Sequence, residues 1–92
     1  NHAKTMAQEL APDNIRVNCV APGSIWVEGG FWNVVKDNNP EMYNGVLQNI
    51  PFERLGTPEE VANVVVFLAS ERASWVSGST IVVDGVQHKG IF

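Results

Sequence analysis

Apolar and polar positions near the start of the chain alternate as they do in an amphipathic helix. The apolar side chains recur at i, i+3, i+4 and i+7, namely at Ala3, Met6, Ala7 and Leu10. Polar residues fill the positions between them. Because proline cannot continue a helix, we expect a helix over residues 3–10 that ends at Ala11-Pro12, followed by a turn at Asp13-Asn14.

Two short runs rich in β-branched residues are typical of buried strands. The first covers residues 15–20 and runs into Pro22-Gly23, while the second covers residues 80–85 and ends in a turn at Asp84-Gly85. Proline next to glycine is a strong turn signal. If the first strand belongs to a parallel sheet, Pro22-Gly23 lies at its carboxyl end, where open α/β folds bind their ligands.

The segment between these strands contains a specific helix start. Thr57 can accept a hydrogen bond from the amide of Glu60, and the Glu60 side chain can reach back to the amide of Thr57. This pattern is a capping box, with Pro58 in the first helical position. The apolar face that follows consists of Val61, Val64, Val65, Leu68 and Ala69. We therefore expect a helix over residues 58–70.

Residues 24–50 show no sustained apolar period. Glycines interrupt this segment, and short helices are expected over about 31–37 and 41–48, with Pro40 placed to begin the second. The segment also concentrates aromatic side chains, at Trp26, Phe31, Trp32 and Tyr43. An insertion of this length in a small domain is usually functional or mobile. Beside a ligand-binding strand end, it predicts a substrate lid.

Helix, strand, insertion, helix and strand in this order form the second half of a doubly wound α/β unit. A right-handed crossover through the helix at 58–70 makes the two strands parallel. Parallel strands are normally covered on both faces and flanked by neighbours, so two of them make too little sheet. We expect an α/β fold whose sheet is incomplete in these 92 residues, and a segment that does not fold alone.

Composition narrows the class of protein. With 45% hydrophobic and 17% charged residues, the 92-residue chain fits a single small globular unit. A net charge of −4 and scattered basic residues disfavour nucleic acid as a partner, and no apolar run approaches the roughly 18 residues that span a bilayer. Cys19 is the only cysteine and the two histidines are far apart, so we expect no intrachain disulfide, no metal site and a reducing, cytoplasmic compartment.

Motifs along nearly the whole chain resemble the C-terminal half of the short-chain dehydrogenases/reductases. They follow that family's order and spacing, and they are Ala7–Pro12, Asn14–Asn18, Val20–Gly23, Gly56–Ala62, Phe67–Ser70 and Gly78–Gly85. Each motif alone is weak, and together they are specific. The resemblance implies the C-terminal part of a Rossmann-type sheet. It also implies an NAD- or NADP-dependent oxidoreductase that transfers a hydride to or from a secondary alcohol or ketone.

The resemblance also assigns a cofactor site. In this family the Pro-Gly turn, here Pro22 and Gly23, lies against the nicotinamide ring. The apolar residue that follows, here Ile25, binds the carboxamide through its backbone. A threonine two places further often touches the cofactor, but Val27 stands at that position, so any contact there comes from the backbone. A second departure is Val86, where the family commonly has glycine.

The family's proton-transfer residues do not occur in these 92 residues. The sequence contains no glycine-rich phosphate loop and no Tyr-x-x-x-Lys pair, since Tyr43 is followed four positions later by Leu47. The family pattern, registered on Glu9-Leu10, puts the catalytic lysine about five residues before Asn1 and the tyrosine about one turn earlier. We therefore expect no catalytic residue in this chain and no activity from this segment alone.

The aromatic residues of the lid allow two interpretations. Trp26, Phe31, Trp32 and Tyr43 would suit a substrate with a bulky apolar or ring portion, or they would only pack the lid against the domain. Asn18 likewise either satisfies backbone groups or adds to the pocket floor, and Cys19 is expected in the core.

A non-catalytic α/β scaffold or oligomerisation segment is the alternative function. The tail at Ile91-Phe92 is a candidate anchor for a homo-oligomer, a dimer or a tetramer. The residues immediately before Asn1 discriminate the two functions, because a Tyr-x-x-x-Lys sequence there supports the enzyme.

Overall fold

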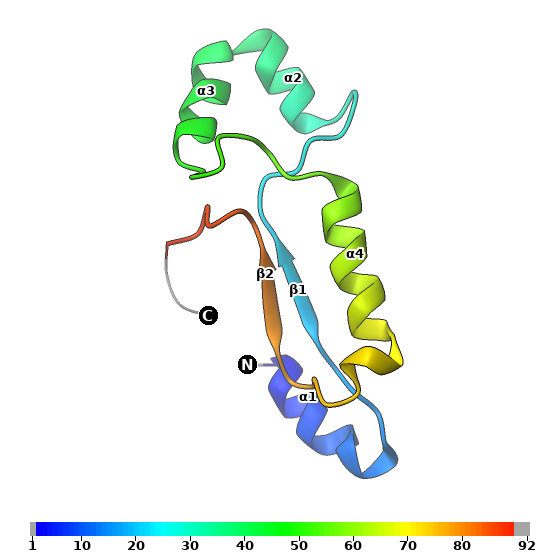
Figure 1. Ribbon diagram of the computed structural model, residues 1–92. Coiled ribbons are helices and arrows are strands. Elements are labelled where there is room, and N and C mark those ends of the chain that lie inside the picture. The colour runs from blue at the N-terminus through cyan, green and yellow to red at the C-terminus, as the bar shows by residue number, and fades with distance from the viewer. Residues whose placement is uncertain (1, 90–92) are drawn as a thin grey trace.

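The computed structural model describes residues 2–89 as an elongated molecule in three parts (Figure 1). Helix α1 lies at one end, two strands and helix α4 form the middle, and a pair of short helices lies at the other end. In chain order the elements are α1 (His2–Leu10), the 3₁₀ turn η1 (Ala11–Asp13), β1 (Cys19–Pro22), α2 (Phe31–Asn38), α3 (Pro40–Gln48), α4 (Pro58–Ala69), the 3₁₀ turn η2 (Glu71–Ala73) and β2 (Thr80–Val83). The tail at Ile91-Phe92 lies outside the described residues.

The two strands are parallel, as the sequence predicts. Their register pairs Cys19 with Thr80 at one end and Pro22 with Val83 at the other. Both strands therefore end at the same edge of the sheet, and the pair of short helices lies beyond that edge (Figure 1). None of the helices described is both long and apolar enough to cross a membrane.

Strand β1 starts at Cys19, later than the predicted start at Ile15. The backbone just before it bonds the connection that precedes β2, since the amide of Gly78 donates to the carbonyl oxygen of Val17 at 2.7 Å. The apolar pattern of residues 15–18 thus does not mark strand pairing, because the ladder begins only where β2 lies alongside.

Two polar side chains, those of Asn18 and Arg16, bind the segment before β1 to the neighbouring backbone. Of the two roles open to Asn18, the structure shows the satisfaction of backbone groups: its amide group donates to the carbonyl oxygen of Val76 at 2.9 Å, and its side-chain oxygen accepts from the amide of Ser79 at 3.1 Å. Arg16 donates to three carbonyl oxygens near the end of α4, those of Leu68, Ser70 and Val76. Carbonyls in the last turn of a helix lack partners within the helix, so Arg16 supplies a donor to Leu68. Its bond to Val76 also joins the segment before β1 to the connection that precedes β2.

Helix α4 begins with the predicted capping box. The amide of Glu60 donates to Thr57 Oγ1 at 3.2 Å, and the amide of Thr57 donates to the Glu60 carboxylate at 2.9 Å. The helix packs along both strands, with Leu68 buried. Its apolar surface extends further, since Val65 is 48% exposed and lines, with Val20 of β1, a groove beside β1. The apolar face of α4 is wider than two strands cover.

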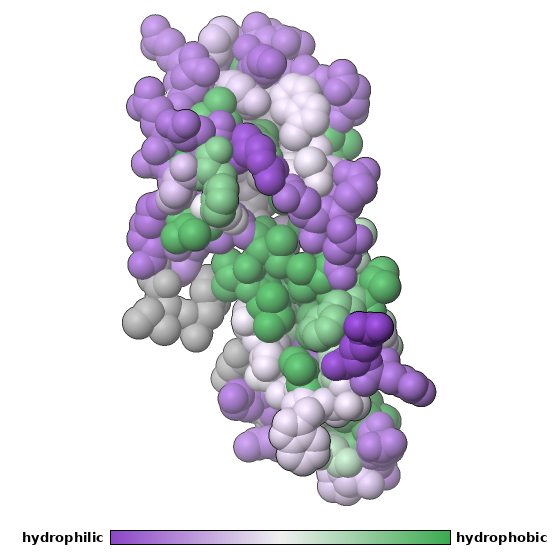
Figure 2. Space-filling view, in the orientation of Figure 1, coloured by the Kyte–Doolittle hydropathy of each residue, from purple (hydrophilic) through white to green (hydrophobic). Residues whose placement is uncertain are grey.

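The described residues enclose little core. The radius of gyration is 16.1 Å, against about 12 Å for a compact domain of this length. The buried apolar residues are few and lie in different parts of the molecule: Ala7, Ile50, Leu55, Leu68 and Ala73. Cys19, expected in the core, is exposed, because within the described residues β2 is the only strand beside β1. Figure 2 shows a continuous apolar surface in the middle of the molecule. Parallel sheets are normally covered on both faces, so this is surface that the rest of such a fold would bury.

Helices α2 and α3 fall inside the predicted insertion and pack against each other. Pro40 begins α3 as expected, and the side chain of Asn39 caps it by accepting from the amide of Met42 at 3.2 Å. The boundaries differ from the predicted 31–37 and 41–48 by a single residue at one end of each helix. Local signals were enough here because caps and proline act within one turn.

Candidate functional site

The turn after β1 forms the centre of the site. The amide of Gly23 donates to the carbonyl oxygen of Val83 at 3.0 Å, which continues the pairing of the strands beyond Pro22. A Cβ atom on Gly23 would lie 2.5 Å from the Cβ of Asp84, closer than two such atoms approach. Only glycine lets the turn lie this close to the end of β2.

Ile25 forms an isolated parallel bridge with Gly56. The two bonds of this bridge use the carbonyl oxygen of Ser24, 3.0 Å from the Gly56 amide, and the amide of Trp26, 2.9 Å from the Gly56 carbonyl oxygen. The amide and the carbonyl of Ile25 take part in neither bond. Because backbone groups alternate in direction along an extended chain, both point away from Gly56. They form a donor and acceptor pair directed to the opposite side.

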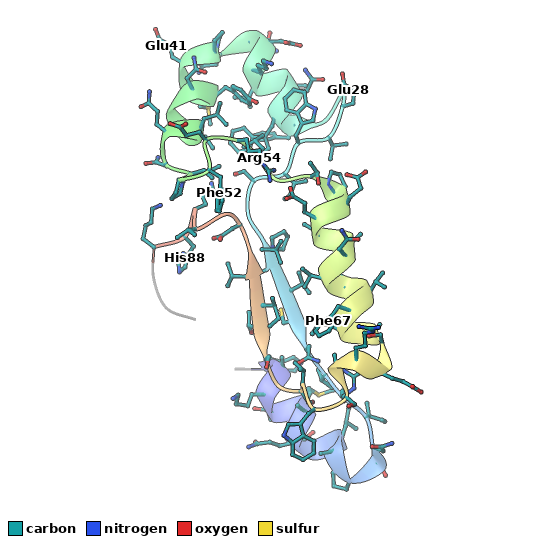
Figure 3. All side chains as sticks on the ribbon, viewed as in Figure 1. Glu28, Glu41, Phe52, Arg54, Phe67 and His88 are labelled. Atoms are coloured by element: carbon teal, nitrogen blue, oxygen red, sulfur yellow. The ribbon has the colours of Figure 1, made fainter. Side chains whose placement is uncertain are left out.

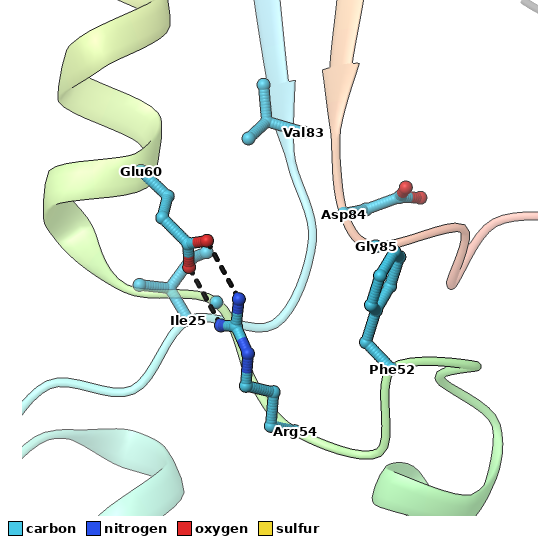
Figure 4. Close-up of a pocket in the computed structure, with 8 residues that line it drawn as sticks. Ile25, Phe52, Arg54, Glu60, Val83, Asp84 and Gly85 are labelled. Carbon is cyan, nitrogen blue, oxygen red and sulfur yellow. Dashed lines mark hydrogen bonds and ion pairs between the residues drawn. The ribbon is translucent and has the colours of Figure 1, made fainter.

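Three hollows surround this turn, and together they contain all four predicted cofactor residues. Pro22, Ile25 and Val27 line an apolar hollow of about 480 Å³ against the first turns of α4. Pro22 and Gly23 also line a polar hollow of about 470 Å³ beside the tail that follows β2. Ile25 reaches a third, more enclosed hollow of about 220 Å³ (Figure 4). The structure thus brings Pro22, Gly23, Ile25 and Val27 together at one strand end.

Arg54 and Glu60 form a bidentate ion pair across the third hollow (Figure 4). The two nitrogens of Arg54 lie 2.8 and 2.9 Å from the two carboxylate oxygens. Hydrogen bonds from Arg54 and from the Thr57 backbone lower the pKa of Glu60 to about 2. The bond to Glu60 also raises the pKa of Arg54. The sequence analysis missed this pair, because six positions across a bend follow no helix or strand period.

Trp26 and Tyr43, two of the predicted substrate residues, lie together in the lid. Their rings meet edge to face, with centroids 6.1 Å apart. The ammonium of Lys36 lies 5.5 Å from the Trp26 ring and 5.6 Å from the Tyr43 ring. Lys36 was not predicted, and its position places a positive charge between two aromatic faces. The Trp26 indole also donates to the Glu28 carboxylate at 3.2 Å.

Phe31 and Trp32 form a separate aromatic pair, edge to face with centroids 5.0 Å apart. Phe31 is 67% exposed, and Trp32 is half-buried. Among the described residues, neither these two rings nor those of Trp26 and Tyr43 line the three hollows at the strand ends. Figure 3 shows residues 24–50, the predicted lid, above the ends of the strands, with Phe52 and Arg54 on the side of the strands.

The four residues of the turn offer binding chemistry. They offer apolar walls, one free backbone donor and one free backbone acceptor, which suit a flat ring that carries a carboxamide. Among residues 2–89, no three side chains of the metal-binding types lie close enough together to hold an ion. General acid–base catalysis at a carbonyl needs a proton donor within hydrogen-bond reach. None of the four residues assigned to the turn carries an ionisable side chain.

Comparison with known proteins identifies the family. The pattern of the family described as enoyl-(acyl carrier protein) reductase matches residues 1–87. The chain belongs to this family, within the short-chain dehydrogenases/reductases, which confirms the resemblance found in the sequence.

Individual relatives and solved structures agree with this assignment. Isoepoxydon dehydrogenase patN of Penicillium expansum is 46% identical over 89 residues, which cover 97% of this chain and 34% of patN. The 3-oxoacyl-(acyl-carrier-protein) reductase FabG of Chlamydia pneumoniae is 46% identical over 82 residues, 89% of this chain and 31% of FabG. The structure of YwfH, an NADPH-dependent reductase, matches with a TM-score of 0.85 at 39% identity, over 99% of this chain and 37% of YwfH.

The hydroxysteroid dehydrogenase of Escherichia coli matches with a TM-score of 0.80 at 42% identity, over 90% of this chain and 33% of that enzyme. The chain spans about a third of the length of the curated relatives it matches. The fold is therefore part of a Rossmann-type, doubly wound α/β sheet, as expected.

Proposed function

We propose that this chain provides the nicotinamide-facing turn and the substrate lid of an NAD- or NADP-dependent oxidoreductase. The enzyme transfers a hydride between the cofactor and a secondary alcohol or ketone. The observation that carries the proposal is the backbone of Ile25, whose amide and carbonyl stay outside the bridge to Gly56 at the carboxyl end of two parallel strands. That edge of an open α/β sheet is where such folds bind ligands.

The residues at the turn fit a nicotinamide. Its ring is flat and apolar on both faces, and Pro22, Ile25 and Val27 supply apolar walls. Its carboxamide both donates and accepts, which matches the free amide and carbonyl of Ile25. Gly23 lets the turn lie against the end of β2, and Val27 would contribute only through its backbone. When bound, the nicotinamide supplies or accepts the hydride.

Proton transfer comes from residues outside these 92. In this proposal a tyrosine and a lysine precede Asn1 on the extension of α1, where the nearby ammonium lowers the pKa of the phenol. The segment alone is therefore inactive. The choice between NAD and NADP is made by the first half of the fold, which carries the phosphate-binding loop.

Residues 24–50 form the substrate lid. Trp26, Phe31, Trp32 and Tyr43 give it aromatic surface suited to a bulky apolar or ring-containing substrate. The ammonium of Lys36, held against two of these rings, adds a site of positive charge. The relatives include a hydroxysteroid dehydrogenase, named for a substrate class with fused rings.

We further propose a homo-oligomer, a dimer or a tetramer, in a reducing, cytoplasmic compartment. The single, exposed cysteine supports the second assignment. Within the proposal the partners are a small-molecule substrate and further copies of the chain, with no nucleic acid and no membrane.

The test is made on the full-length protein that contains these residues. NADH and NADPH are titrated by nicotinamide fluorescence, and their oxidation is followed with cyclic and acyclic ketones. We expect saturable binding of one cofactor and turnover with a ring ketone. A protein that binds neither cofactor, with no Tyr-x-x-x-Lys before Asn1, would instead be the α/β scaffold.

A further inference from the structure

The tail after β2 binds the turn that follows β1 through the side chain of Gln87. The amide of Ser24 donates to Gln87 Oε1 at 2.9 Å, and Gln87 Nε2 donates to Ser24 Oγ at 3.0 Å. One carboxamide therefore binds both the backbone and the hydroxyl of one residue, 63 positions earlier in the chain. A carboxamide donates through its nitrogen and accepts through its oxygen, so one side chain can make both bonds.

The tail is folded so that it delivers this side chain. The two carboxylate oxygens of Asp84 accept from the amides of Val86 and His88, at 2.9 and 2.8 Å. The amide of Gln87 donates to the carbonyl oxygen of Asp84 at 3.1 Å, which closes the turn. Gln87 is half-buried, while the tail residues on both sides of it are exposed. Its side chain is thus directed into the molecule, against the turn.

Ser24 is held on every polar group that it has. Gln87 binds its amide and its hydroxyl, and its carbonyl oxygen accepts from the amide of Gly56 at 3.0 Å. The same contacts depend on Gly23, since a Cβ there would lie 2.8 Å from Gln87 Oε1. Ser24 directly precedes Ile25, so fixing Ser24 fixes the direction of the peptide group that joins the two residues. That peptide group contains the amide of Ile25.

We propose that Gln87 is a positioning residue for the nicotinamide, which acts through Ser24 on the direction of the Ile25 amide. This inference rests on the proposed function. Gln87 itself does not bind the cofactor, and its contribution is to remove the freedom of the backbone that does. Preorganised donors bind better because no ordering cost remains to be met on binding. The tail after β2 thereby becomes a determinant of affinity for the nicotinamide half of the cofactor.

Three variants of the full-length enzyme test this role. Gln87→Met keeps the length of the side chain and removes both hydrogen bonds. Gln87→Glu keeps two acceptor oxygens. One accepts from the Ser24 amide, and the other accepts from the Ser24 hydroxyl, which rotates to become the donor. Gln8→Met makes the same chemical change on the exposed surface of α1, away from the turn. For each variant the dissociation constants of the reduced cofactor and of ADP-ribose, the KM and kcat, and the melting temperature are measured.

ADP-ribose discriminates positioning from general stability, because it lacks the nicotinamide. We expect Gln87→Met to weaken binding of the reduced cofactor about tenfold, the size expected for one to two net hydrogen bonds. Its affinity for ADP-ribose should stay within about twofold of the wild-type value, less than the loss of one net hydrogen bond. Gln87→Glu should restore most of the affinity for the reduced cofactor, and Gln8→Met should change neither constant.

Equal losses for the reduced cofactor and ADP-ribose, or no loss for either, would overturn the role of Gln87. If Gln87→Met does not fold, the test uses Gln87→Glu. A tenfold loss of affinity for the reduced cofactor in that folded variant would contradict the role given to the two hydrogen bonds between Ser24 and residue 87. A wild-type protein that binds ADP-ribose but no nicotinamide cofactor would overturn the proposed function itself, and the role of Gln87 with it.

Discussion

Arg54 and Glu60 join the end of the lid to the first turn of α4 through a bidentate pair, with nitrogen–oxygen distances of 2.8 and 2.9 Å. The same carboxylate accepts from the amide of Thr57 and so belongs to the helix cap as well. Arg54 also donates to the carbonyl oxygen of Leu55 at 3.0 Å. The Glu60 carboxylate therefore binds both Arg54, in the segment that follows the lid, and the cap of α4.

This pair makes stability depend on pH in the acidic range. The pKa of Glu60 is about 2 in the folded protein, against an ordinary value of 4.5. A lowered pKa in the folded state means that the stabilisation is complete above about pH 4.5 and is lost as the pH falls towards 2. We expect the melting temperature to drop over that interval, and to drop less in Glu60→Gln.

Glu59→Gln is the matched control, because it removes a neighbouring carboxylate and leaves the pair with Arg54 intact. It should keep the wild-type slope of melting temperature against pH. Since the side chains of Arg54 and Glu60 are 55% and 43% exposed, 1 M salt should reduce the difference between wild type and Glu60→Gln. Identical slopes for wild type and Glu60→Gln would show that the pair contributes nothing measurable.

Val86 adopts a backbone angle that β-branched residues avoid. Its φ is 67°, in the left-handed region, where the family commonly has glycine. We expect Val86→Gly to raise the free energy of unfolding by about 1 kcal/mol, measured by urea denaturation. Val86→Ala, which keeps a Cβ, should gain much less. A destabilised Val86→Gly would mean that the valine side chain makes contacts worth more than the backbone strain.

Gly23 and Gly45 give opposite predictions for the same substitution. At Gly23 a methyl group would meet Asp84, so Gly23→Ala should lower the melting temperature and weaken binding of the reduced cofactor about tenfold. Gly45 lies inside α3 with nothing within 4 Å of the added Cβ, so Gly45→Ala should stabilise the protein by about 1 kcal/mol. Thermal melts and cofactor titrations of both variants check this contrast.

The aromatic rings of the lid should set substrate preference. Trp26→Ala and Trp32→Ala are expected to lower kcat/KM for a fused-ring ketone about tenfold and to affect a small ketone less, with cofactor affinity unchanged. Trp75→Ala is the control, because Trp75 is 98% exposed and precedes β2, away from the lid. Unchanged preference in both lid variants would show that these rings only pack the lid.

The melting and unfolding measurements are made on the full-length protein, because the 92-residue segment by itself should not melt cooperatively. Too few side chains are buried to offset the entropy of ordering the chain, and the apolar face of α4 is left uncovered. We expect a weak, broad thermal transition and little near-UV circular dichroism. A sharp transition with a strong near-UV spectrum would contradict this prediction.

What the sequence predicted correctly was encoded within a few residues. The capping box at Thr57, the start of α3 at Pro40 and the parallel order of the strands all follow from local signals and one topological rule. The predicted start of β1 was wrong, because backbone pairing and not the apolar pattern decides where a ladder begins. The prediction that Cys19 lies in the core was wrong for a related reason, since its burial depends on strands that are not among the described residues.

The contacts that the sequence did not reveal join distant segments. Gln87 meets Ser24 across 63 positions, and Lys36 meets Trp26 and Tyr43 only after α2 and α3 fold against each other. No period or motif marks such pairs, because their proximity is created by the fold. The turn at Pro22-Gly23 could be found because a strand end and a resemblance both pointed to it.

The bridge between Ile25 and Gly56 brings the start of the lid beside the segment that leads from its end into α4. A loop whose ends already meet can lengthen or shorten cheaply, at about 0.6 kcal/mol of closure entropy per doubling of length. The insertion should therefore tolerate replacement by a segment of a different length. Under the proposed function, a graft of the corresponding stretch of another family member between these two anchor points should change which substrates are accepted, while the strands and the turn beneath it keep their geometry.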